Sequence, residues 1–146
     1  MIFVLLQLFS ILYGFNVDAP DFVKEYHQAS TQQMASAYIE TYSNRTNPSI
    51  QGYVISLKMK QSKYYFLPWN KFTNFKREKE NLEKLISKNP NNVHLKYVRL
   101  VIQEKLPKIL NYYSHIKEDK KFLEVFLAKE DSMNYLDFYI KKNTSL

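Results

Sequence analysis

The chain has 146 residues, enough for one domain with its own core. Hydrophobic residues make up 45% of it and aromatic residues 16%, which argues against disorder along the whole chain. Two glycines are few for the tight turns of an all-β fold, and the lack of cysteine excludes disulfides, thiolate metal sites and cysteine nucleophiles. The predicted fold class is a single all-α domain.

The positive charge is unevenly distributed. The net charge is +7, but residues 1–56 hold two basic and four acidic side chains, whereas residues 57–146 hold 19 and 10. A solvated lysine-rich surface is the simplest interpretation of this asymmetry, because Glu alternates with Lys through much of the basic half. An anionic partner such as a lipid surface, a glycan or nucleic acid is the alternative.

An apolar run at residues 2–13 gives the prediction of compartment. It is shorter than the ~20 residues that span a bilayer, and its length suits the core of a signal peptide. We therefore expect residues 1–14 to be a signal peptide and residues 18–146 to form one helical domain, exported to the periplasm or cell envelope. Because no basic residue precedes the run, the alternative is a cytoplasmic protein in which residues 1–14 form a short buried or interfacial helix.

Apolar spacing and helix-start residues predict a succession of short helices after residue 18. Prolines and capping residues such as Thr31 and Asn70 mark their expected starts. The expected segments cover residues 20–29, 32–42, 48–66, 71–88, 93–105, 106–113 and 115–129, with a last helix capped by Asp131 or Ser132. Tyr64 and Phe72 are expected to face the core.

Gly52 and the segment 93–105 depart from a simple helical pattern. Gly52 lies inside a predicted helix, where glycine costs about 1 kcal/mol relative to alanine, so we expect a close contact with a neighbouring helix there. In segment 93–105, Val93, Leu95 and Tyr97 alternate with polar residues, which indicates a strand. The alternation ends at Val98 and strong helix formers follow, so a helix is favoured.

The joint between segments 71–88 and 93–105 resembles a known type of helical repeat. Residues 81–93, with the sequence Asn-Leu-Glu-Lys-Leu-Ile-Ser-Lys-Asn-Pro-Asn-Asn-Val, resemble the end of one tetratricopeptide-type repeat and the start of the next. The chain from about residue 52 to 122 is similar to a family of small, exported, functionally uncharacterised helical proteins. That similarity comes from Pro90-Asn91-Asn92, Leu95, Arg99-Leu100, Gln103, Pro107, Tyr112-Tyr113, Ile116 and Asp119. The resemblance implies an irregular, tetratricopeptide-like stack of short antiparallel hairpins and implies no function.

Motifs for chemistry are few. No two of the three histidines stand at positions i and i+4, two distant glycines cannot form a phosphate-binding loop, and no serine lies in a nucleophile elbow. His115 could share a helix face with Glu118 and Asp119, but a solvated polar face explains this spacing better than a metal site does. The sequence thus predicts no catalytic residue, no metal, no cofactor and no enzymatic activity.

Arg99 stands in an otherwise apolar segment. A buried guanidinium needs a carboxylate or carbonyl partner to offset its loss of hydration. We expect Asp119 or Glu104 to supply that partner, with Arg99 and Asp119 as the preferred pair in a structural role.

A mixture of basic and aromatic residues over positions 58–79 suggests a contact region. The predicted contact surface consists of Trp69, Arg77, Tyr112 and Tyr113. The favoured function is a non-catalytic scaffold for an unknown protein or peptide. The alternatives are a small-ligand binder or enzyme with a pocket between helices, and a binder of anionic polymers through residues 58–79. Association with a membrane surface and the oligomeric state are left open, and nucleic acid is disfavoured.

Overall fold

The computed structural model describes residues 18–130 and 133–146, which are helical and contain no strand. These two ranges form seven α-helices and two short 3-10 helices in one compact domain, so the prediction of a single all-α domain is confirmed. The elements are α2 (Asp21–Gln28), α3 (Gln32–Tyr42), α4 (Pro48–Lys60), η1 (Gln61–Tyr64), α5 (Pro68–Lys88), α6 (Val93–Lys105), η2 (Lys108–Leu110), α7 (Ile116–Leu127) and α8 (Tyr135–Asn143).

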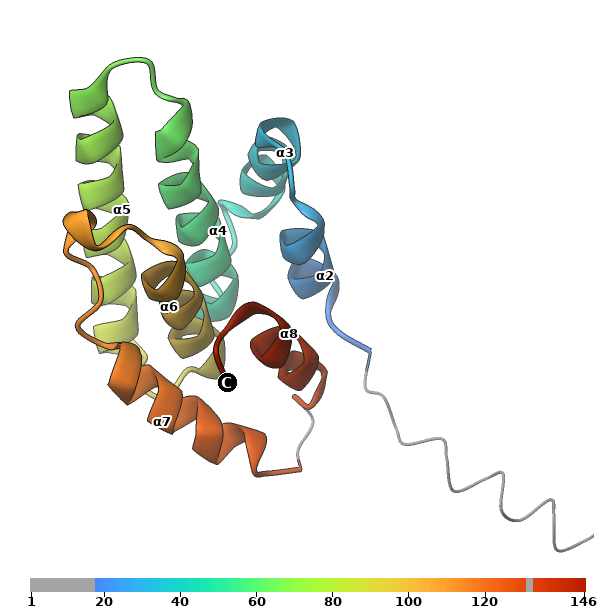
Figure 1. Cartoon of the computed structure of the whole chain (residues 1–146). Helices are drawn as coiled ribbons and strands as arrows, with labels where there is room; N and C mark the ends of the chain where they lie inside the picture. Colours follow the sequence, from blue (N-terminus) through green and yellow to red (C-terminus); the bar gives the residue numbers. More distant parts are fainter. Residues whose placement is uncertain (1–17, 131–132) are drawn as a thin grey trace, which may run out of the picture.

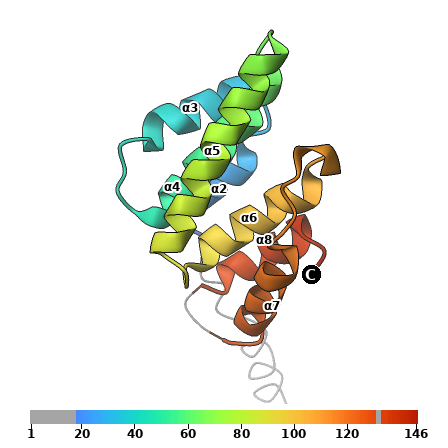
Figure 2. The same ribbon diagram turned by 90° about the vertical axis from the view of Figure 1, so that its left-hand side faces the viewer.

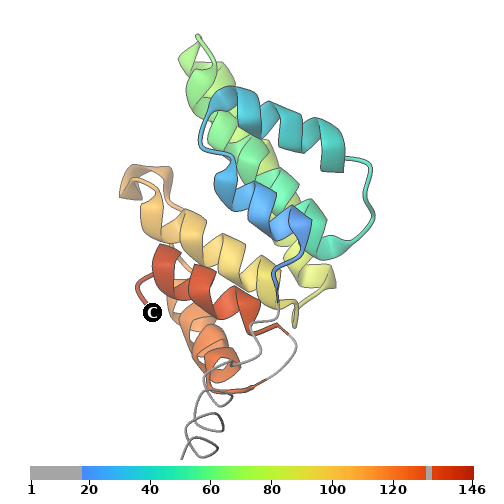
Figure 3. The same cartoon turned by 90° about the vertical axis from the view of Figure 1, so that its right-hand side faces the viewer.

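The helices pack around α4 and α6, which run side by side in the same direction (Figure 1). The antiparallel α5 packs against α4, and α7 packs against α6. Figure 2 shows that the α4 and α5 hairpin extends well beyond the neighbouring helices at the end where the two helices are joined. On the other side, α2 and α8 lie along α4 and α6 (Figure 3). The tetratricopeptide-like arrangement stays a prediction.

Side chains at the helix starts explain several boundaries. Thr31, Asn47 and Asn92 each accept hydrogen bonds from backbone N–H groups in the first turn of the helix that follows. These caps satisfy donors that have no partner within the helix. The helix is therefore the correct interpretation of residues 93–105, and α3 has the predicted bounds.

Gly52 lies at the contact between α4 and α6. A Cβ atom at this position would lie 2.3 Å from Cδ2 of Leu95, a fully buried side chain on α6. The two helices can approach this closely only because residue 52 has no side chain. Asn92 and Ser49 add a hydrogen bond of 3.0 Å between the starts of the same two helices.

The core is unusually rich in polar aromatic side chains. Tyr53 of α4 and Tyr97 of α6 are among its largest fully buried members, beside Leu82, Leu95, Leu123 and Leu136. Buried tyrosine hydroxyls need hydrogen-bond partners. Two histidines supply them: Nδ1 of His94 lies 2.7 Å from the Tyr53 hydroxyl, and Nε2 of His27 lies 2.7 Å from the Tyr97 hydroxyl.

The predictions for residues 61–72 are wrong in two respects. The helix that begins at Pro48 ends at Lys60 and continues as a 3-10 turn, and α5 begins at Pro68 rather than at residue 71. Tyr64 and Phe72 are exposed instead of facing the core. The reason is that the joined end of the hairpin projects past the neighbouring helices (Figure 1), and Tyr64 lies only at the edge of the start of α3.

Other predicted segments are shorter than expected. Residues 106–113 contain only η2, and α7 covers a smaller range than 115–129. The suggested caps Asp131 and Ser132 and the signal peptide at residues 1–14 lie outside the described residues, so export stays a prediction. Among residues 18–130 and 133–146, no helix has the length and apolar composition that a membrane span requires.

Candidate contact site at the hairpin end

The turn between α4 and α5 exposes a cluster of large apolar side chains. Phe66 is 93% exposed and Trp69 is 63% exposed, and over residues 63–73 only Leu67 is even partly buried. We call this segment the aromatic-basic tip. Its aromatic members are Tyr64, Tyr65, Phe66, Trp69 and Phe72. In Figures 1 and 2 it forms the outermost end of the α4 and α5 hairpin.

The charge around the tip has one sign. No Asp or Glu occurs between Glu40 and Glu78, and the basic residues in this interval are Arg45, Lys58, Lys60, Lys63, Lys71, Lys76 and Arg77. The ammonium group of Lys63 lies 4.8 Å from the centre of the Tyr64 ring, a distance suited to a cation–π contact. The tip therefore combines aromatic surface with the positive charge of Lys63 and Lys71, whereas Arg77 farther along the hairpin is paired with Glu78.

Asn74 holds the base of the tip together. It is buried, and its amide donates hydrogen bonds of 3.0 Å to the Lys58 carbonyl and 2.8 Å to the Ser62 hydroxyl. Its carbonyl accepts a hydrogen bond from Arg77, which also contacts the buried Glu78 at 3.1 Å. These contacts tie the first turns of α5 to the end of α4, so the aromatic side chains are presented on an ordered support.

Two of the four residues predicted for the contact surface belong to this region. Trp69 is on the tip, and Arg77 lies just below it with a largely exposed side chain. Tyr113 is exposed but lies in the segment between η2 and α7. Tyr112 is only 3% exposed, so its assignment to a contact surface is wrong. It is buried because its ring packs edge-on against Phe75 and its hydroxyl donates to Glu83 at 2.5 Å.

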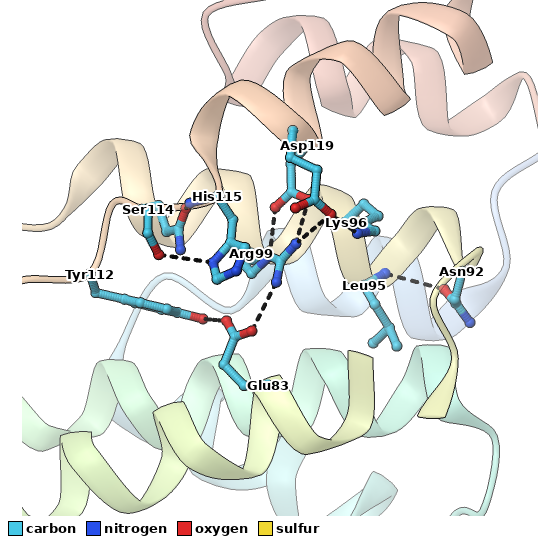
Figure 4. A network of polar contacts seen from close by, with 11 residues as sticks. Glu83, Asn92, Leu95, Lys96, Arg99, Tyr112, Ser114, His115 and Asp119 are labelled. Carbon is cyan, nitrogen blue, oxygen red and sulfur yellow. Dashed lines mark hydrogen bonds and ion pairs between the residues drawn. The ribbon is translucent and has the colours of Figure 1, made fainter. Parts of the chain in front are cut away.

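A second polar cluster surrounds Arg99 (Figure 4). The guanidinium donates two hydrogen bonds of 2.7 Å to the fully buried Asp119 and one of 2.8 Å to Glu83. Burial alone would lower the pKa of Arg99, because it disfavours the charged guanidinium. The hydrogen bonds and negative charges of Asp119 and Glu83 have the larger, opposite effect, so the pKa of Arg99 is raised. Glu104, the alternative partner, lies instead with Lys120 and Ser145.

This cluster has the properties of a structural tie. Arg99 of α6 bonds to Asp119 of α7 and to Glu83 of α5, so it connects three helices. Lys96 adds ion pairs of 2.7 Å to Glu118 and 3.5 Å to Asp119. The hydrogen bond from Lys96 lowers the pKa of Glu118. Every charged side chain of the cluster is therefore held in at least one ion pair.

The suggested metal-binding face at His115 does not form. His115 lies 3.1 Å from the Ser114 hydroxyl, whereas Glu118 and Asp119 are engaged by Lys96 and Arg99. Within the two described ranges, no group of three His, Asp or Glu side chains is arranged to hold a metal ion.

A pocket of about 350 Å³ opens between α2, α4, α6 and the end of α8. One side carries a polar group in which His27 and Asn143 both contact the Tyr97 hydroxyl, at 2.7 and 3.1 Å. The remaining walls are mainly apolar, with Lys60 and Lys105 at the helix ends. Because α4 and α6 run parallel, both lysines stand at the same end of the pocket, where they also complement the negative helix C-termini.

Sequence reasoning missed three features of these sites. Glu83, Asn74 and the pocket beside His27 depend on which helices become neighbours, and no local pattern indicates that. Comparison with known protein families, with curated proteins and with solved structures found no match.

Proposed function

We propose that the protein is a non-catalytic interaction module whose contact surface is the aromatic-basic tip. The observation that carries the proposal is the exposure of five large aromatic side chains within nine residues, with Phe66 almost fully solvated. Scattered exposed apolar residues are ordinary, but a contiguous exposed cluster on a soluble domain marks an interaction site. Trp and Tyr are also the residues that contribute most to binding at interfaces.

The support beneath the tip favours binding. Since Asn74, Ser62 and the Lys58 carbonyl fix the two sides of the turn, little backbone entropy is lost when a partner binds. An aromatic cluster maintained only for folding would face the core. The fold gains nothing from Phe66, because its side chain is almost entirely in water.

Site-specific photo-crosslinking in the native cell tests this proposal. A photoreactive phenylalanine analogue is placed at position 66 of the full chain and, as the matched control, at position 109, where Ile109 is 90% exposed on η2. We expect adducts to a cellular component from position 66 and few from position 109. Equal labelling from both positions, or none from either, would remove the proposal.

The pocket beside His27 favours a second candidate function, the binding of a small apolar molecule. Its volume is at the lower end of the range for ligand sites, and the Tyr97 hydroxyl with its two partners provides a polar anchor in an apolar wall. Val101 lines the pocket, so Val101→Trp should fill it with a larger side chain. Binding of an environment-sensitive apolar dye, compared between the protein and this variant, tests the candidate function. Equal dye binding by both forms would argue against a site in this pocket.

A further inference from the structure

We infer that the partner of the aromatic-basic tip is an anionic lipid bilayer surface. The inference rests on the proposed function, because it names the partner of the same surface. Three independent properties of the tip support it: the kinds of aromatic residue, the sign of the surrounding charge and the convex shape.

The aromatic residues suit the boundary between lipid and water. Trp69, Tyr64 and Tyr65 each combine an apolar ring with a polar group, and such side chains concentrate at the headgroup level of membranes. Phe66 lacks a polar group and is the most exposed of the five, so it is suited to enter the acyl region. Leu67, next to it, adds aliphatic surface to the same turn.

The charge around the tip favours lipids with negative headgroups. Lys63 and Lys71 flank the aromatic residues within the turn, and Lys60, Lys76 and Arg77 follow along the hairpin. With no carboxylate between residues 40 and 78, nothing in this segment repels an anionic surface. Each lysine near such a surface contributes roughly fivefold to the binding constant.

The shape of the tip favours a bilayer over a peptide or a nucleic acid. A bound peptide normally occupies a groove or extends a sheet, and single-stranded nucleic acid follows a basic groove with stacking rings. Neither the pocket beside His27 nor the shallow pocket beside Gln51 includes a residue of the tip. Tyr64 lines a small hollow beside the start of α3, but its volume of about 10 Å³ is too small to hold a peptide or a base. The turn protrudes from the body of the protein (Figure 1), and its exposed aromatic side chains present a wedge that a fluid surface can accommodate.

Trp69 provides a direct test because it is the single tryptophan of the chain. The full-length protein is titrated with vesicles of phosphatidylcholine alone and with vesicles containing phosphatidylglycerol. We expect the Trp69 emission to shift to the blue with the anionic vesicles and to change little with the neutral ones. An unchanged emission while the protein sediments with the vesicles would overturn the inference, because another segment would then hold it there.

Substitutions on the tip show which side chains contribute to vesicle binding. Phe66→Ser is expected to weaken binding to anionic vesicles by about tenfold or more, because the loss of one buried apolar side chain costs a factor of this size. Lys63→Gln combined with Lys71→Gln should weaken it by about twentyfold and reduce the preference for anionic lipid. The matched control Ile109→Ser should bind as the unmodified protein does. Loss of binding with Ile109→Ser, or none with Phe66→Ser, would contradict the inference.

Two outcomes separate this inference from the proposed function. If position 66 crosslinks to a protein in cells while the Trp69 emission does not change with vesicles, the tip is an interaction surface but its partner is a protein and not a bilayer. If the protein binds heparin or DNA but the Trp69 emission does not change with anionic vesicles, the partner is a soluble polyanion and the inference of a bilayer is wrong. Failure of crosslinking from position 66 would remove the proposed function, and this inference with it.

Discussion

At the scale of single residues, the buried charged side chains that the structure describes are all paired. Asp119 is fully buried, and Arg99 supplies the hydrogen bonds and the opposite charge that make this burial tolerable. The need of Arg99 for a partner can be predicted from the sequence, because the residue interrupts an apolar segment. The involvement of Glu83 cannot, since it depends on how α5 lies against α6.

Removal of the guanidinium should be costly. Arg99→Met leaves the Asp119 carboxylate buried with only Lys96 nearby, so we expect a loss of about 3–5 kcal/mol in the free energy of unfolding. Denaturation with urea measures it. The double variant Arg99→Met, Asp119→Leu should recover a large part of the loss, because no unpaired charge stays buried. A single variant as stable as the parent would show that the pair is not a structural tie.

The buried histidines predict a dependence of stability on pH. Burial, assisted by the nearby His27, lowers the pKa of His94 from 6.5 to about 4. Between these values the unfolded chain binds a proton that the folded protein does not, so stability falls as the pH falls from 6.5 to 4. Burial also lowers the pKa of His27, which changes stability in the same direction.

Protonation of His94 alone should lower the free energy of unfolding by about 3 kcal/mol between pH 6.5 and 4. Urea denaturation at a series of pH values, compared between the protein and His94→Gln, measures the contribution. The variant should show a clearly shallower decline between pH 6.5 and 4. Equal slopes for the two proteins would contradict the burial of a neutral imidazole between Tyr53 and Tyr135.

At the scale of helices, the starts can be predicted more reliably than the ends. Thr31 and Pro48 mark starts by local chemistry, and the structure uses both. The end of α4 was placed too late because the apolar spacing continues past Lys60, and the start of α5 was placed too late because Asn70 was assigned as its cap, whereas Pro68 is its first residue. Periodicity shows which residues share a face, but it does not show where the neighbouring helices stop covering that face. Phe72 lies beyond that limit.

The crossing of α4 and α6 gives a prediction whose sign depends on the background. Gly52→Ala places a methyl group against Leu95, and overpacking typically costs about 1–3 kcal/mol, more than the ~1 kcal/mol that alanine gains in helix propensity. We expect net destabilisation. In the Leu95→Ala background the same substitution should stabilise, because the space is open. Thermal unfolding of the four proteins measures both effects, and the same sign in both backgrounds would be inconsistent with the contact.

At the scale of the whole molecule, the packed helices joined by ion pairs are distinct from the exposed end of the α4 and α5 hairpin. Arg99 and its carboxylates join α5, α6 and α7, while Asn74 holds the base of the hairpin whose end projects into solvent. The sequence indicates the mixture of basic and aromatic residues over positions 58–79 but not its placement. Tyr112 was assigned to the contact surface for the same reason, since no local pattern indicates that Phe75 and Glu83 cover it.

Quenching of Trp69 fluorescence by brominated lipids tests most directly whether the tip contacts a membrane. The full chain is mixed with anionic vesicles whose acyl chains carry bromine at different depths, and the emission of the single tryptophan is recorded. We expect strong quenching by bromine near the headgroups and weaker quenching by bromine deep in the bilayer. Emission that no brominated lipid reduces, under conditions where the protein is bound to the vesicles, would contradict this contact.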